Sequence, residues 1–282
     1  MSLESLFPEA VGAEKVEHAD DWVAVEENGQ TFYLPLASLS EREKALLTLK
    51  NDGVLDASIT DNPWYRYLVQ NDTSASQGYK CLQIIYIDHK ELLPEELFEF
   101  FETLLPNMLA HVVISKNRTL LILNQEETLE AQALVKDVLP TLESDFGLKL
   151  TVFFGNIWNK LQADELPLYY QEESRLFANA GHYLGNERTV TFSEMLLLAY
   201  AHQLDLPAIK HKILQAIDDN KDTRMIITTM WQEQGNLAKT AQSLYIHRNS
   251  LHYKLEKFRL ASGLNLKNLN DLAFVYLLIM EN

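Results

Sequence analysis

The pattern of apolar and polar residues begins with a short alternating stretch. Between positions 21 and 35, apolar and polar residues alternate on both sides of Asn28-Gly29, a dipeptide that favours a tight hairpin turn. We therefore expect two short strands joined at this turn. Ser40 and Glu43 then have the spacing of a capping box, which predicts a helix that continues to about Lys50.

Residues 51–78 are rich in Asp, Asn, Ser and Thr, and we interpret them as a linker with one helical turn around Trp64–Val69. The pattern then becomes regular. Strands are expected at Lys80–Ile87, Met108–Ser115, Thr119–Leu123 and Leu148–Phe154, and amphipathic helices at Pro94–Leu105 and Glu127–Phe146. This β-α-β-β-α-β order is typical of the ferredoxin-like fold, a four-stranded antiparallel sheet with two helices on one face.

After Asn156 the pattern predicts helices and no further strand. A second capping box, Thr191 to Glu194, begins one helix, and another is expected at Pro207–Ile217. A third runs over Thr223–Gln234, where Asp222 is the expected N-cap and Gly235 the stop.

The expected fold is therefore α+β, with an N-terminal hairpin, a ferredoxin-like domain and an all-helical C-terminal half. We divide the chain into residues 1–75, a hairpin, helix and linker; 76–156, the ferredoxin-like domain; 157–221, a helical connector; and 222–282, a C-terminal domain.

Composition supports a folded protein of two or three domains, because 47% of its 282 residues are hydrophobic and 23% are charged. The longest apolar stretch, Leu272 to Met280, is far shorter than the roughly 18 residues that cross a bilayer. The first residues lack the pattern of a secretion signal, and the single cysteine, Cys81, lies in an apolar run as a core residue. A cytoplasmic location is the expectation.

The net charge of −16 argues at first against a nucleic-acid partner, but the charge is unevenly distributed. Residues 236–282 contain six Lys or Arg and three acidic residues, a net charge of +3, and the remaining 235 residues carry −19. This segregation indicates two separate tasks for the two parts of the chain.

The basic part contains a helix-turn-helix pattern. Asn236 is a suitable N-cap for a short helix over Leu237–Leu244, whose inward positions are Leu237, Ala241 and Leu244. Ala241 is informative because a small side chain lets the two helices cross closely. Tyr245-Ile246 forms the turn, and a second helix begins near His247 or Arg248 and continues to about Ala261, before Gly263.

On a helical wheel the second helix has an apolar face of Leu251, Leu255 and Phe258. The opposite face and its flanks carry hydrogen-bonding and cationic side chains suited to a DNA major groove. We expect the DNA-binding residues to be His247, Arg248, Asn249, Ser250, His252, Tyr253, Lys254 and Lys257. For Tyr253, a place at the edge of the core is an equally good interpretation.

Residues 241–255, read as AQSLYIHRNSLHYKL, resemble the C-terminal helix-turn-helix of the PucR and CdaR (sugar diacid regulator) family of transcriptional regulators, whose core reads approximately A-x-x-L-x-I-H-R-N-T-L-x-Y-R-L. Ser250 replaces the family's Thr and keeps the hydroxyl. Lys254 replaces Arg and keeps the charge but not the bidentate geometry. More loosely, the resemblance extends over residues 222–282.

The resemblance also implies a degenerate relative of the GGDEF nucleotide-cyclase domain upstream, and residues 80–154 have its order of elements. The hairpin at positions 115–118, Ser-Lys-Asn-Arg, lacks the glycine and acidic residues of active cyclases. Asp88 follows the first strand where a metal ligand could lie, but a two-metal site needs more carboxylates, and we interpret Asp88 as a strand-end residue. We expect no enzyme activity, no cofactor and no metal.

The sequence therefore predicts a DNA-binding transcriptional regulator, dimeric or larger, with an acidic N-terminal region for sensing or oligomerisation. Its expected partners are double-stranded DNA, further copies of itself and a small-molecule effector, with no membrane. The alternative is a protein-interaction or small-molecule-binding module whose helix-turn-helix no longer binds DNA, which the net charge permits. An enzyme that uses the α/β domain on a nucleotide is a remote third hypothesis.

Overall fold

The computed structural model describes residue 7 and residues 22–27, 30–35, 38–40, 61–75, 78–127, 129–180 and 188–281. The chain forms two compact units, residues 1–56 and residues 57–282. The first contains strands β1 (Trp22–Glu27) and β2 (Gln30–Pro35), which pair antiparallel with Glu27 opposite Gln30. The two expected strands are confirmed. Their turn residues, and the helix predicted up to Lys50, lie outside the described residues.

The second unit is built on a five-stranded sheet with the strand order β4-β5-β3-β6-β7. Its strands are β3 (Cys81–His89), β4 (Met108–Ser115), β5 (Arg118–Asn124), β6 (Leu150–Asn159) and β7 (Thr189–Thr191). Helix α5 (Glu95–Leu104) follows β3, and α6 (Ala131–Phe146) follows β5. The predicted β-α-β-β-α-β order is therefore confirmed, with all four of its strands paired antiparallel.

Strand β7 corrects the prediction that the C-terminal half is entirely helical. It pairs parallel to β6, with Val190 opposite Phe153 and only 3% exposed. Three residues, Thr-Val-Thr, are too few to show strand periodicity, so only the tertiary contact with β6 defines this strand.

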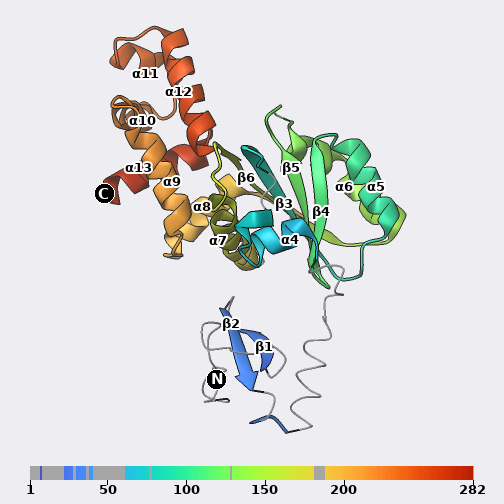
Figure 1. Cartoon of the computed structure of the whole chain (residues 1–282). Coiled ribbons are helices and arrows are strands. Elements are labelled where there is room, and N and C mark those ends of the chain that lie inside the picture. Colours follow the sequence, from blue (N-terminus) through green and yellow to red (C-terminus); the bar gives the residue numbers. More distant parts are fainter. Residues whose placement is uncertain are drawn as a thin grey trace. The chain divides into compact units, whose positions relative to one another are not determined.

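The two faces of the sheet are covered by different helices (Figure 1). Helices α5 and α6 pack on one face, where Ile85, Ile87 and Phe101 belong to one apolar cluster. The other face carries α7 (Glu165–Ala180) and α4 (Pro63–Leu68). There Tyr86 stacks on Tyr170, with ring centroids 6.2 Å apart. The sheet is thus the middle of three layers.

Residues 61–75 correct the interpretation of this stretch as a linker. The expected helical turn is present as α4, and a short 3₁₀ helix, η4, follows at Thr73–Ala75. Asn62 caps α4 by accepting a hydrogen bond from the Trp64 amide at 2.9 Å. Trp64 and Leu68 are buried, so the segment belongs to the core of the second unit.

The remaining helices are α8 (Phe192–Ala201), α9 (Pro207–Asp218), α10 (Thr223–Gln232), α11 (Leu237–Ser243), α12 (Arg248–Ser262) and α13 (Leu269–Glu281). The predicted capping box of α8 is confirmed, because Thr191 accepts from the Glu194 amide and the Glu194 side chain accepts from the Thr191 amide. One apolar cluster runs from the sheet into these helices and includes Ile84 and Leu278. Among the described residues, no helix combines the length and apolarity needed to span a bilayer.

Candidate nucleic-acid interface

Helix α11 is the first helix of the helix-turn-helix and begins as the sequence predicts. The Asn236 side chain accepts hydrogen bonds from the amides of Ala238 and Lys239, each at 3.1 Å. Ala241 is 5% exposed in the contact with the neighbouring helices, as its small size requires. Thr240 is fully buried, and the apolar pattern missed it because threonine is polar. Its burial is possible because its hydroxyl donates to the Asn236 carbonyl oxygen at 2.8 Å.

The turn between the two helices depends on the backbone of Tyr245. This residue has a φ of +53°, in the left-handed region, and its side chain is 96% exposed. The Ile246 amide then donates to the Ala241 carbonyl oxygen at 3.0 Å, which closes the turn. The side chain of Tyr245 therefore projects from the connection rather than filling the core.

Helix α12 is the second, recognition-type helix. His247 is its N-cap, and its Nδ1 accepts a hydrogen bond from the Asn249 amide at 3.2 Å. Leu251, Leu255 and Phe258 are at most 4% exposed, which confirms the predicted apolar face. Gly263 ends the helix in the left-handed region.

The opposite face of α12 is open to solvent in its first turns. The exposed residues among those predicted to bind DNA are His247, Arg248, Asn249, Ser250, Tyr253 and Lys257. Tyr253 is 72% exposed, so the structure resolves its two interpretations in favour of the surface. His252 and Lys254 are half-buried on the flanks. Arg248 makes no ion pair with the part of the chain that is described.

Lys254 connects α12 to the start of α10. Its Nζ lies 2.7 Å from Oδ2 of Asp222. This contact corrects the predicted role of Asp222, whose side chain makes no capping hydrogen bond to α10. The carboxylate pairs with a lysine 32 positions away in sequence instead of capping the helix, and no local pattern predicts that partner. A phosphate contact by Lys254 requires this exposed ion pair to open.

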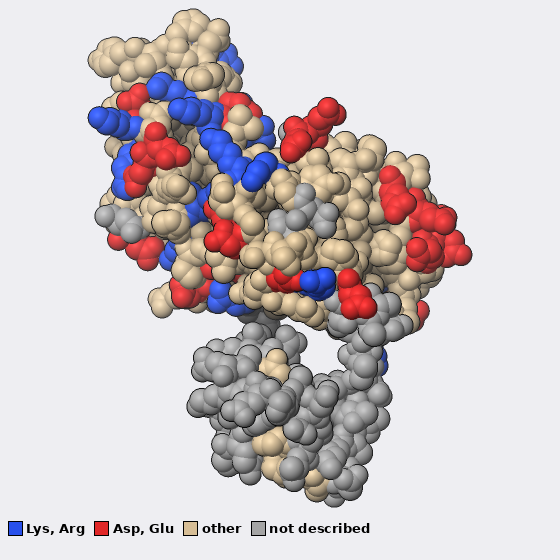
Figure 2. Space-filling model, in the orientation of Figure 1, with Lys and Arg blue, Asp and Glu red and all other residues tan. Residues whose placement is uncertain are grey.

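Charge is distributed unevenly over the surface of the second unit. Figure 2 shows Lys and Arg gathered over the helical part that contains α12, with some Asp and Glu among them, whereas the end around α5 shows Asp and Glu only. Four exposed glutamates, Glu95, Glu96, Glu99 and Glu102, lie on that helix. The helix-turn-helix therefore presents a cationic surface on an otherwise acidic protein.

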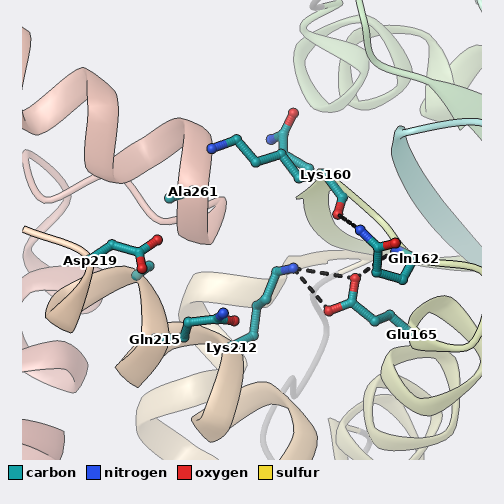
Figure 3. A pocket seen from close by; sticks show the side chains of 9 residues that line it. Lys160, Gln162, Glu165, Lys212, Gln215, Asp219 and Ala261 are labelled. Carbon is teal, nitrogen blue, oxygen red and sulfur yellow. Dashed lines mark hydrogen bonds and ion pairs between the residues drawn. The ribbon is translucent and has the colours of Figure 1, made fainter.

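A polar cavity of about 250 Å³ lies behind the C-terminal end of α12 (Figure 3). It is lined by Asn159, Lys160, Gln162, Glu165, Lys212, Gln215, Ala216, Asp219 and Ala261. The Lys212 Nζ approaches Glu165 Oε1 at 3.1 Å. The cavity is therefore lined by an ion pair, by the further charged residues Lys160 and Asp219 and by side-chain amides. It lies at a junction between β6, α7, α9 and α12.

Asp88 does not stand among other carboxylates. Its two oxygens accept hydrogen bonds from Arg118 at 2.6 and 2.8 Å, across the paired strands β3 and β5. Within the described parts of the chain, no three His, Cys, Asp or Glu side chains are grouped to hold a metal ion. Cys81 is buried as predicted, and burial raises the pKa of its thiol to about 11.

Comparison with known proteins agrees with the geometry of α11 and α12. Residues 225–280 match the model of the PucR C-terminal helix-turn-helix domain. Over 281 residues the chain is 34% identical to the "Leucine-rich protein" of Streptococcus dysgalactiae subsp. equisimilis, with both chains covered completely. It is 22% identical over 294 residues to the "Uncharacterized protein YxkF" of Bacillus subtilis, covering all of this chain and 98% of that one.

A regulator of polyketide synthase expression from Bifidobacterium adolescentis is similar in structure at a TM-score of 0.41 and 16% identity, covering 84% of this chain and 96% of that one. Residues 225–280 are therefore a C-terminal helix-turn-helix domain of the PucR type. The chain as a whole belongs to the family of the streptococcal leucine-rich protein.

Proposed function

We propose that the protein binds DNA sequence-specifically and regulates transcription, with α12 in the major groove. The observation that carries the proposal is the division of α12 into a buried apolar face and an exposed polar face on its first turns. Arg248 and Asn249 are side chains that read the edges of guanine and adenine, respectively. Both are exposed, and both lie within the family-matched segment.

The other exposed groups have supporting tasks in this proposal. Ser250 and Tyr253 reach base edges or sugars, and Lys257 meets phosphate one turn further along. His247 contacts phosphate from the N-cap. His252 and Lys254, on the flanks of α12, contact the phosphate backbone of the DNA. Lys254 then exchanges its ion pair with Asp222 for a phosphate.

A mobility-shift assay with fragments of the host genome tests the proposal. Wild-type protein should select a defined sequence, and the double variant Arg248→Ala, Asn249→Ala should lose it, because two bidentate base contacts each contribute about 1–3 kcal/mol. The matched control is Gln132→Ala, Lys136→Ala, which removes an exposed amide and an exposed cation from α6. Unchanged binding in the α12 double variant would refute the assignment.

Salt titration separates this function from the alternative protein-interaction module. DNA binding through phosphate contacts should weaken steeply as salt rises, since condensed counterions are released on binding. A contact with a neutral protein partner should change little over the same range. A shallow salt dependence of whichever complex forms would favour the alternative.

Dimerisation is a further part of the proposal, because one short recognition helix makes few base contacts and two half-sites multiply specificity. The outward stripe of α13 suits a second copy of the chain. It consists of the exposed Leu269 and Met280 and, between them, the half-buried Ala273, Tyr276 and Leu277, all uncharged. Most of the protein is strongly acidic, so two copies repel each other elsewhere but not across this uncharged stripe.

Sedimentation of wild-type protein should therefore give a concentration-dependent dimer, and Met280→Lys should shift it towards monomer. Met280 is 68% exposed, so the variant places the new charge on the surface without disturbing the core. Met225→Lys, at a site 55% exposed on α10 but outside the stripe, is the control and should leave the dimer intact. A monomeric wild type at all concentrations would exclude this interface.

We also assign the sensing of an effector to the acidic part of the chain, upstream of the helix-turn-helix. The polar cavity beside Ala261 supports this, because a molecule bound there contacts both β6 and the end of α12. The divisions at residues 156/157 and 221/222, the degenerate GGDEF-like identity of the sheet domain and a cytoplasmic location stay predictions.

A further inference from the structure

A buried hydrogen bond joins the C-terminal end of α12 to the sheet. The Asn156 Nδ2 on β6 donates to the carbonyl oxygen of Ser262 at 2.9 Å. Asn156 is 5% exposed and Ser262 is 1% exposed, so water does not replace this bond. The last carbonyls of a helix have no partner within the helix, and Asn156 satisfies one of them.

The contact is also close-fitting. Gly263, directly after Ser262, has a φ of +79°, and a Cβ added there would lie 2.3 Å from Oδ1 of Asn156. Only glycine allows the Asn156 amide to lie against the backbone at this point. The Ser262 hydroxyl donates to the Phe258 carbonyl oxygen at 2.9 Å and accepts from the Leu264 amide at 3.1 Å, which fixes the carbonyl that Asn156 meets.

Asn156 is held in turn by a buried glutamate on α7. Its backbone amide donates to Glu173 Oε1 at 2.9 Å, and the Trp158 Nε1 donates to the same oxygen at 2.9 Å. The Tyr86 hydroxyl donates to Glu173 Oε2 at 2.8 Å. Glu173 has no exposed surface, and the absence of a side chain at Gly155 makes room for its carboxylate. A chain of hydrogen bonds thus runs from α7 through β6 to α12.

Because this hydrogen bond lies at the C-terminal end of α12, it limits how far the helix can tilt. Helix α12 has 15 residues and is about 22 Å long at a rise of about 1.5 Å per residue. A tilt of about 10° at its C-terminal end moves its first turn by about 4 Å on that length. Hydrogen bonds to base edges tolerate only a few tenths of an ångström. Small freedom at Ser262 therefore removes base contacts at Arg248.

We propose that Asn156 is a positioning residue for DNA recognition, which fixes the angle of α12 on the sheet and couples the sheet domain to the helix-turn-helix. The proposal rests on the proposed DNA-binding function. It assigns to β6 a part in DNA affinity although β6 lies outside the matched helix-turn-helix segment. Changes in the sheet domain then reach the DNA through this bond.

The first test is Asn156→Ala in the full chain. The backbone amide that binds Glu173 remains, so only the link to Ser262 is lost. DNA affinity should fall about tenfold, which corresponds to about 1.4 kcal/mol. The matched control is Asn107→Ala, which removes a similar bond inside the sheet domain, from Asn107 Nδ2 to the Asn124 carbonyl oxygen at 2.8 Å. The control should leave DNA affinity within twofold of wild type.

The second test approaches the same contact from α12. Gly263→Ala pushes the Asn156 amide away and should also weaken DNA binding. In the double variant Asn156→Ala, Gly263→Ala the clash no longer exists, so the combined loss of affinity should be smaller than the product of the two single losses. If Asn156→Ala alone proves too unstable to measure, Gly263→Ala compared with wild type and with Asn107→Ala tests the same contact without it.

Hydrogen exchange separates failure of this proposal from failure of the proposed function. In Asn156→Ala, amides at the end of α12 should exchange faster than in wild type, whereas those of Arg248→Ala should not change there. Faster exchange without any DNA binding by wild type would overturn the DNA-binding function and, with it, the role of Asn156 in recognition. DNA affinity equal in Asn156→Ala and Asn107→Ala, with both folded, would overturn the positioning role alone.

Discussion

The two ends of α12 differ in their exposure and in what they contact. Its first turn is exposed, begins at the His247 cap and carries Arg248 and Asn249 away from the protein. At its other end Ser262 is buried, and Ser262 and Gly263 lie against Asn156 of the sheet. The two tasks of the helix are thus separated along its length. The free end supplies hydrogen-bonding groups, and the held end determines where they point.

The largest expected change in stability comes from a substitution on the buried face of α12. Leu255→Ala should lower the free energy of unfolding by about 2–5 kcal/mol, because Leu255 is 3% exposed and its loss leaves a cavity. Denaturant unfolding at constant pH measures it. The control is Tyr253→Ala on the open side, where about 0.5 kcal/mol or less is expected. Equal losses at the two sites would contradict the division of α12 into two faces.

The next effect is a pH dependence of stability that arises from Glu173, the residue that binds Asn156 beside the C-terminal end of α12. Burial raises the pKa of this carboxyl to about 7, although hydrogen bonds from the Asn156 amide, Tyr86 and Trp158 act to lower it. The folded protein therefore binds a proton more tightly than the unfolded chain between about pH 4.5 and 7. Stability should fall as pH rises through this window and level off above it, by on the order of 3 kcal/mol.

Glu173→Gln should abolish that part of the pH dependence, since its carbonyl still accepts from Asn156 and its amide faces the Tyr86 hydroxyl. Unfolding in denaturant at pH 5 and pH 7.5 gives the comparison. Asp271, whose pKa burial raises to about 6, titrates in both proteins and cancels in the difference. Tyr170 and Arg118 also lie near the Tyr86–Glu173 pair and remain in both. Parallel pH profiles for wild type and variant would show that Glu173 does not titrate there.

The smallest effect concerns the free end. His247→Ala removes the side chain that accepts from the Asn249 amide and should cost about 0.5–1 kcal/mol of stability. His247→Asn should restore it, because asparagine is a strong N-cap. His211→Ala, at an exposed site on α9, is the control in thermal unfolding. A loss in His247→Asn as large as in His247→Ala would mean that capping is not the role of this side chain.

Much of this molecule could be predicted because its signals are local. The apolar runs of β3 to β6, the amphipathic pattern of α5 and the caps at Thr191 and Asn236 each depend on neighbours within a few residues. The apolar face of α12 follows from helical periodicity in the same way. The exposed face is its geometric complement, so the candidate site was largely predictable as a surface.

Other features have no local signal. Asp222 is a plausible N-cap in sequence, yet its carboxylate pairs with Lys254. The segment around Trp64 looks like a linker because its flanks are polar, and its burial depends on the sheet face that it covers. The three residues of β7 become a strand only beside β6.

The sequence by itself determined strands β3 to β6, helices α5 and α6, the helix-turn-helix and the chemistry that α12 exposes, because periodicity, capping and side-chain type act over a few residues. Only the tertiary structure decided that the sheet is covered on both faces and that Glu173, Asn156 and Ser262 form one connected chain of hydrogen bonds. The physical reason is that a buried polar group must find a partner in space, and distance along the chain does not limit that choice.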